Sequence, residues 1–240
     1  SVGSALADAV LLSGVPENAS AKADPTGWAF RRGRFSFRLE NLCLTATIHG
    51  MTTLAQPIQY TPDDVERASH HDGKRYELID GQLKEKNVGT RVLFVASRIC
   101  DRLNAAFYPR FGFAAVEAMI YCFDRPNHGR KPDVVFISFG RLGSTTIPQG
   151  DIHVAPELVV EVLSPGNAGI EVEEKLNAYL DAGIQLVWIV NPDRRTIRAY
   201  RKDGTTRLYR ENDALENEPL LPGLRLVARE VFPVEPTPNS

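Results

Sequence analysis

Two short apolar runs, each carrying a carboxylate, constrain the fold of this chain more than any other feature. The first is Pro132-Asp133-Val134-Val135-Phe136-Ile137, and the second runs from Pro156 to Pro165 with Glu161 among valines and leucines. Runs of this length bounded by proline, glycine and serine are typical of buried strands. A carboxylate buried alone is so costly that it normally pairs with a cation, binds a metal or takes up a proton. The runs therefore predict two buried strands whose acids, Asp133 and Glu161, meet at one site.

Other patterns place helices and further strands around these two runs. Thr61 followed by Pro62 and two aspartates is typical of a helix start, and Asp80-Gly81 between alternating segments is typical of a hairpin turn. Apolar periodicity predicts helices over 88–107 and 170–182. An apolar run predicts a buried strand over 186–190, and composition predicts β-type structure over 113–123 and a polar, glycine-rich loop over 139–156. A turn at Lys202-Asp203-Gly204 predicts a hairpin over 196–210. Strands and helices in this order predict an α/β fold with a mixed central β-sheet flanked by helices.

The 240 residues suffice for one ordinary domain with an additional segment. Residues 1–50 show no sustained period, and the first methionine is Met51. We therefore expect a disordered N-terminal extension over 1–50, a folded domain over 51–232 and a loose, proline-rich tail over 233–240. A basic, aromatic stretch between Trp28 and Arg38 leaves a nucleic-acid-binding arm open as an alternative for the extension.

Charge and cysteine content exclude few partners. The formal net charge of −2 gives no attraction of the whole molecule to nucleic acid, so any such binding needs a local patch. No apolar run approaches the roughly 18–20 residues of a membrane span. Three cysteines without metal-ligand spacing are typical of reduced thiols, which favours a cytoplasmic protein. Candidates for the local patch are Arg125, Arg130, Lys131, Arg194, Arg195, Arg198, Arg201 and Lys202.

The residues of the two runs indicate a metal site. Two carboxylates, completed by backbone oxygens and water, suit Mg²⁺, and such an ion activates water and polarises a phosphoryl oxygen. Lys175 lies on the helix after the second strand, where an ammonium would stabilise the charge that builds up on an attacked phosphate. An alternative remains open, in which Lys175 extends along its helix and pairs with Glu171.

Several motifs in this order resemble one protein family, the Uma-two family of the PD-(D/E)XK nuclease superfamily. These motifs are Tyr76–Gly81, Pro132–Phe136, Pro156–Pro165, Lys175-x-x-x-Tyr179 with Gly183, Trp188–Pro192 and Leu221–Gly223. The resemblance covers about residues 57–232. It implies a restriction-endonuclease-like fold, with Asp133 and Glu161 as metal-binding acids and Glu77 as an accessory acid. Leu163 stands where the superfamily pattern has its lysine, and the resemblance implies that Lys175 replaces that lysine.

The resemblance implies a Mg²⁺-dependent endonuclease that hydrolyses DNA phosphodiester bonds through a metal-activated water, with Mn²⁺ as an alternative ion. Its catalytic residues would be Asp133, Glu161, Lys175 and Glu77. A second function of another class stays open, namely a catalytically silent protein of nuclease fold that binds DNA or another protein. The residues do not separate DNA from RNA as substrate, and they leave a homodimer open.

Overall fold

The computed structural model describes residues 45–48, 51–54, 58–164 and 169–234, with side chains from residue 58 onward. Contacts between residues divide the chain into two units, with the boundary between Leu54 and Ala55. The first unit contributes a hairpin of β1 (Thr45–Ile48) and β2 (Met51–Leu54), which the sequence patterns did not predict. Apart from β1, the expected extension over 1–50 lies outside the described residues, as does most of the expected tail.

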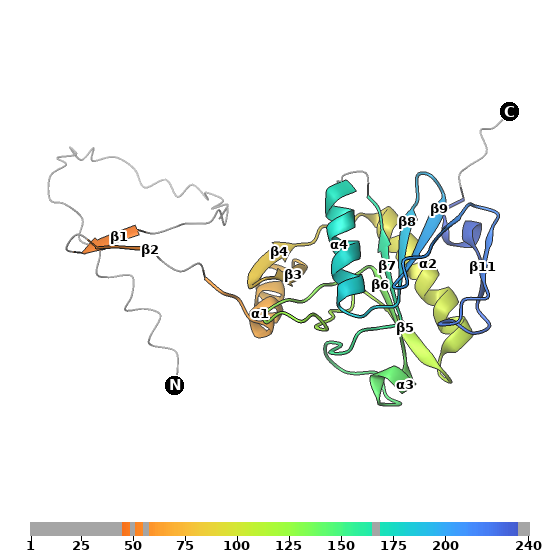
Figure 1. Cartoon of the computed structure of the whole chain (residues 1–240), viewed down its shortest axis with the longest axis horizontal. Coiled ribbons are helices and arrows are strands. Elements are labelled where there is room, and N and C mark those ends of the chain that lie inside the picture. The colour runs from red at the N-terminus through yellow and green to blue at the C-terminus, as the bar shows by residue number, and fades with distance from the viewer. Residues whose placement is uncertain (1–44, 49–50, 55–57, 165–168, 235–240) are drawn as a thin grey trace, which may run out of the picture. The chain divides into compact units, whose positions relative to one another are not determined.

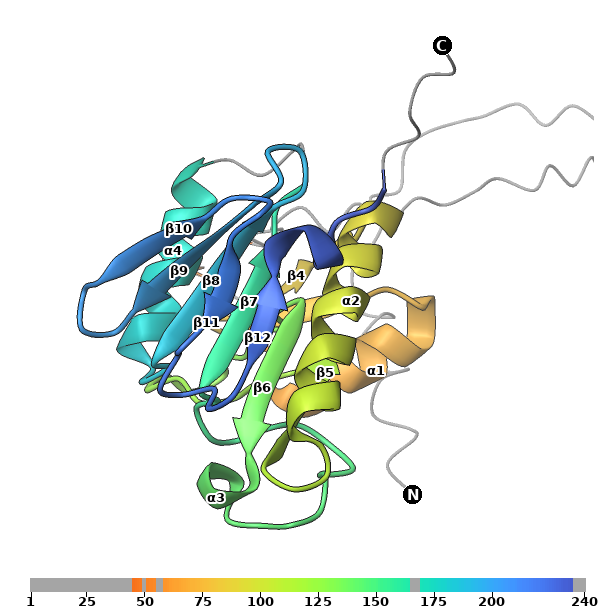
Figure 2. The ribbon, with the colours of Figure 1, turned by 90° about the vertical axis from the view of Figure 1, so that its right-hand side faces the viewer.

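The second unit is built on a six-stranded sheet with the strand order β10-β9-β8-β7-β6-β5. Its strands are β5 (Gly112–Val116), β6 (Val134–Ser138), β7 (Leu158–Val162), β8 (Leu186–Asn191), β9 (Thr196–Arg201) and β10 (Thr206–Tyr209). Strands β7 and β8 run parallel, whereas the other neighbours are antiparallel. The predicted α/β fold with a mixed central sheet is therefore confirmed (Figure 2).

Two helices cover opposite faces of this sheet (Figure 1). The apolar stripe of α2 (Thr90–Phe107) packs against the even-numbered residues of β6 and β7, such as Phe136 and Val160. Tyr179 of α4 (Gly169–Asp181) packs against the odd-numbered residues, such as Val159. All five residues of β6 and all five of β7 are buried, which is why these strands read as continuous apolar runs.

Smaller elements complete the unit. Helix α1 (Pro62–Asp72) begins after Thr61 as predicted, because the Asp64 carboxylate accepts a hydrogen bond from the Thr61 N–H. The predicted hairpin of β3 (Tyr76–Ile79) and β4 (Gln82–Glu85) turns at Asp80 and Gly81, both at positive φ. Elements that the patterns did not predict are α3 (Phe139–Leu142), β11 (Ala214–Glu216), β12 (Arg225–Val227) and the 3₁₀ turn η1 (Ala228–Val231).

The register of β6 and β7 positions the two acids. Val134 lies opposite Val160 in this antiparallel pair. Continuing the ladder by one residue places Asp133, just before β6, opposite Glu161, near the end of β7. The sequence therefore brings both acids to the same end of two central strands. Within the described residues, no helix combines the length and apolar character that crossing a membrane requires.

Candidate active site

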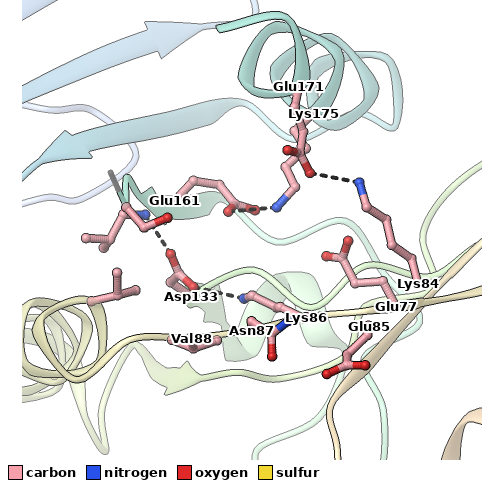
Figure 3. A pocket seen from close by; sticks show the side chains of 13 residues that line it. Glu77, Lys84, Glu85, Lys86, Asn87, Val88, Asp133, Glu161, Glu171 and Lys175 are labelled. Carbon is pink, nitrogen blue, oxygen red and sulfur yellow. Dashed lines mark hydrogen bonds and ion pairs between the residues drawn. The ribbon is translucent and has the colours of Figure 1, made fainter. Parts of the chain in front are cut away.

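A pocket of about 110 Å³ opens where β6 begins and β7 ends. Four residues singled out from the sequence, Glu77, Asp133, Glu161 and Lys175, all line it. They come from β3, from the residue just before β6, from β7 and from α4 (Figure 3). The structure thus brings together side chains that are up to 98 residues apart in the chain, since Glu77 and Lys175 differ by that number.

Asp133 is held from two sides. Its Oδ2 accepts a hydrogen bond of 2.6 Å from the Val162 backbone N–H, and its Oδ1 accepts one of 2.9 Å from the Lys86 ammonium. Burial and the negative charge of Glu161 raise the pKa of Asp133 to about 6, although Lys86 and the Val162 N–H oppose this rise. The negative charge of Glu161 therefore favours the protonated form of Asp133, whereas the Lys86 ammonium favours the ionised form.

Glu161 is held by two side chains of α4. Tyr179 donates its hydroxyl to Oε1 at 2.5 Å, and the Lys175 ammonium lies 3.2 Å from Oε2. Residues four positions apart share one face of a helix, so α4 presents both donors to the same carboxylate. Burial raises the pKa of Glu161, but the positive charges of Lys175 and Lys86 and the Tyr179 hydrogen bond outweigh it, so the net shift is downward. Glu161 therefore remains ionised in the interior.

Lys175 pairs with Glu161 and not with Glu171, the alternative partner that the sequence left open. Glu171 binds the Lys84 ammonium at 2.8 Å instead, and the Lys175 side chain is only 14% exposed. Burial lowers the pKa of Lys175, yet Glu161 and Glu77 raise it by more, so Lys175 is an ammonium. A lysine that merely solvates a helix surface would not be buried in this way.

Glu77 reaches the pocket from the β3–β4 hairpin. Its side chain is buried, and its Oε1 accepts a hydrogen bond of 3.0 Å from the Lys131 backbone N–H. The Arg130 guanidinium lies 3.7 Å from Oε2. Arg130, which the sequence placed among candidates for a basic surface patch, is therefore a buried partner of Glu77 instead.

Lys86 is the residue of the site that the sequence did not reveal. It follows β4 in the charged stretch Lys84-Glu85-Lys86, where a lysine normally faces solvent. Its ammonium binds Asp133, the Glu117 carboxylate at 2.8 Å and the Lys131 carbonyl oxygen. Burial lowers the pKa of Lys86, but the negative charges of Asp133, Glu161 and Glu117 raise it by more, so Lys86 is positively charged. No periodicity in the sequence points to a buried lysine here.

The second apolar run contains another buried acid, Glu157, at the opposite end of β7 from Glu161. The Ser138 hydroxyl and backbone N–H both donate to its carboxylate, and the Arg141 guanidinium lies 3.1 Å away. Glu157 thus joins the end of β6 to α3 and takes no part in the pocket. A buried acid in a strand does not by itself indicate a site, because a hydroxyl and a guanidinium satisfy this one.

The donor set of the pocket fits one divalent ion. Among the described residues, each oxygen of Asp133 and Glu161 accepts one hydrogen bond, and each carboxylate oxygen can accept two. Both acids therefore keep lone pairs for a cation, and Mg²⁺ is commonly held by one or two carboxylates with water completing its shell. Within the described part of the chain, no three His, Cys, Asp or Glu side chains form a ready-made metal cluster, so water and backbone oxygens would complete the shell.

Comparison with known proteins agrees with the fold. A model of the Uma2 family, which is the Uma-two family of the sequence resemblance and carries the description "Putative restriction endonuclease", matches residues 62–230. A crystal structure from Anabaena variabilis, described as "a putative nuclease belonging to DUF820", is 22% identical with a TM-score of 0.56. The match covers 67% of this chain and 90% of that chain, and at this identity it shows the fold alone. A comparison with curated proteins found no match. Because the family model spans most of the chain, this protein belongs to the Uma2 family.

Proposed function

We propose that this protein is a divalent-metal-dependent endonuclease that hydrolyses phosphodiester bonds of DNA. The family description supports a nuclease, and one observation carries the proposal further. Asp133 and Glu161 line one pocket at the same end of two central strands, with the Lys175 ammonium on Glu161. Two acids and one lysine around a small polar pocket are the groups that phosphodiester hydrolysis needs.

Asp133 and Glu161 would hold Mg²⁺, or Mn²⁺ in its place. When bound, such an ion supplies Lewis-acid chemistry, which lowers the pKa of water and neutralises charge on a phosphate. The chain keeps the two acids in position without the ion. The Val162 N–H orients Asp133, and Tyr179 orients Glu161.

Lys175 is the group best placed to act on the substrate. An ammonium has three N–H donors, and Lys175 uses one on Glu161 among the described residues. Two donors remain for phosphate oxygens, whose negative charge grows as the phosphate is attacked. Because the pKa of Lys175 is raised, its positive charge persists through neutral and mildly alkaline pH.

The test is incubation of the purified protein with supercoiled plasmid, with Mg²⁺ or Mn²⁺ and with a chelator. We expect nicked and linear products only with metal, and none from Asp133→Ala or Glu161→Ala. Glu171→Ala is the matched control, because Glu171 also lines the pocket but pairs with the exposed Lys84, and it should still cut.

Cleavage that survives both acid substitutions, or that needs no metal, would contradict the proposal. Retarded migration of the plasmid without any cutting would favour the silent DNA-binding protein instead. A parallel reaction with single-stranded and duplex RNA decides between DNA and RNA as the substrate.

A further inference from the structure

Lys86 sits in a cage of oxygen atoms beside the two acids. Its ammonium nitrogen lies 2.9 Å from Asp133 Oδ1 and 2.8 Å from Glu117 Oε1, and it also donates to the Lys131 carbonyl oxygen. The side chains of Lys86, Glu117 and Asp133 are 11%, 13% and 4% exposed. Two carboxylates and one backbone carbonyl are the ligand set with which proteins hold hard divalent cations. Here a lysine of the chain occupies that set.

The cage is built into the fold. Glu117 follows β5 directly and adopts φ 52°, an unusual conformation for a residue other than glycine. Its backbone N–H donates to the Asp133 carbonyl, which fixes Glu117 beside the start of β6. The Lys86 backbone N–H donates to the Arg75 carbonyl, which fixes the base of the lysine. The backbone on both sides of the cage is therefore held in place.

The two lysines of the pocket differ in what they have left to donate. Three acceptors use all three N–H groups of Lys86, whereas Lys175 uses one on a described residue. Lys86 would have to break a buried ion pair to reach a substrate phosphate. Lys86 is therefore suited to hold Asp133 and to supply a fixed positive charge, and not to bind the substrate phosphate.

Asp133 stands between two cation positions. Its Oδ1 faces Lys86, and both it and Glu161 face the pocket where a divalent ion would bind. Sites with two metals place the ions about 3.5–4 Å apart, so neighbouring ions are near enough to contact the same carboxylate. We propose that Lys86 is a built-in cation that fills the second of two adjoining cation positions, so that the pocket takes one divalent ion and not two. The first position rests on the proposed function, whereas the cage around Lys86 does not.

The test counts Mn²⁺ ions bound to the metal-free protein, by electron paramagnetic resonance of free Mn²⁺ and by calorimetry. We expect one ion for the native chain and two for Lys86→Ala, which removes the ammonium and its stem. Lys84→Ala is the matched control, because Lys84 lines the same pocket but is 53% exposed and pairs with Glu171. It should bind one ion.

Removing an acid of the cage together with its lysine separates the cage from the rest of the pocket. Lys86→Ala combined with Glu117→Ala should return the count from two ions to one. Circular dichroism first establishes that each variant is folded. If Lys86→Ala does not fold, Lys86→Gln replaces it, because the amide is neutral and its oxygen can join the cage, and two ions are again expected.

The outcomes separate this inference from the proposed function. A folded Lys86 variant that binds no more ions than the native chain overturns the inference, and so does a native chain that binds two. A native chain that binds none, with a Lys86 variant that binds one, supports the cage and contradicts the proposed ion at Asp133 and Glu161.

Discussion

At the scale of single residues, the lysine beside Glu161 differs in position from the lysine of the nuclease pattern that the sequence resembles. Leu163 stands two residues after Glu161, where the pattern has lysine, and its side chain lines a small second cavity with Glu161 and Lys175. A lysine just after β7 and a lysine on α4 would therefore reach the same carboxylate. Under the proposed function, either position would supply an ammonium beside Glu161.

This equivalence leads to an exchange experiment. Lys175→Ala should still bind Mn²⁺ but cut plasmid about 10²–10³-fold more slowly, the usual cost of losing one group that stabilises charge in a transition state. Adding Leu163→Lys to that variant should raise its cleavage rate at least about tenfold above that of Lys175→Ala alone. Single-turnover cleavage measures this rate. Wild-type rates in Lys175→Ala would remove Lys175 from the chemistry, and no recovery in the double variant would show that the two positions are not equivalent.

The residue patterns singled out those site residues that lie in or beside strands and helices with a clear apolar pattern. Glu161 stood out because it interrupts an apolar strand, Asp133 because it begins one, and Lys175 because it lies within the apolar stripe of a helix. The family resemblance alone implied a role for Glu77. Lys86 follows a strand in a charged stretch, and its partner Glu117 follows another strand at positive φ. Neither position belongs to a periodic pattern, so only the folded chain brings them together.

At the scale of elements, close backbone contact fixes the edge strand β5. A β-carbon added at Gly112 would lie 2.3 Å from the Ile137 carbonyl oxygen and 2.7 Å from the Ser138 Cα, both on the neighbouring strand β6. Backbone atoms cannot move aside as a flexible side chain does. We expect Gly112→Ala to lower the free energy of unfolding by about 1–3 kcal/mol, the usual cost of overpacking.

Denaturation in urea measures this effect, with Gly150→Ala as control. A β-carbon at Gly150 would meet nothing within 4 Å. The control should therefore unfold within about 0.5 kcal/mol of the native chain, as exposed substitutions usually do. Equal stability of the two variants would contradict the close backbone contact of Gly112 with Ile137 and Ser138.

The elements that were predicted are those with long or strong patterns. Helix α2 has a stripe of buried residues over 18 positions, and β6, β7 and β8 are nearly continuous apolar runs. Strands β11 and β12 have three residues each, and α3 has four. Segments this short contain less than two periods of any pattern, so their structure depends on contacts elsewhere in the chain. The β-type structure predicted over 113–123 is a strand only as far as Val116, and Ile120 beyond it forms isolated bridges with Arg130 and Ile152.

At the scale of the whole molecule, the candidate basic patch is partly neutralised. Ion pairs tie Arg125 to Asp80, Arg130 to Glu77, Arg195 to Glu211 and Arg201 to Glu218. Arg194, Arg198 and Lys202, around β9, are exposed, and no ion pair within the described residues neutralises them. These three are the strongest remaining candidates for contacts with phosphate groups.

Charge reversal at these three positions tests whether they contact DNA. Arg194→Glu, Arg198→Glu and Lys202→Glu together should weaken binding. They should also make the dependence of log affinity on log salt shallower by about 2–3, because each lost phosphate contact removes close to one unit of slope. Fluorescence anisotropy of a labelled duplex across a salt series measures both effects.

The control carries the same change in net charge at Arg110, Arg225 and Arg229, which are also exposed. It should weaken binding through net charge but leave the slope steeper than in the first variant. Equal slopes in the two variants would move the DNA-binding surface away from β9.

The proposed function requires that Asp133 and Glu161 together hold one divalent ion in the pocket between β6, β7 and α4. Crystals soaked in MnCl₂ and measured at a wavelength where manganese scatters anomalously test it directly. We expect a single anomalous peak at about 2.1–2.2 Å from an oxygen of each acid, with Lys86 still bound to Asp133. A pocket without a peak at saturating Mn²⁺, or a peak that only one of the two acids contacts, would contradict it.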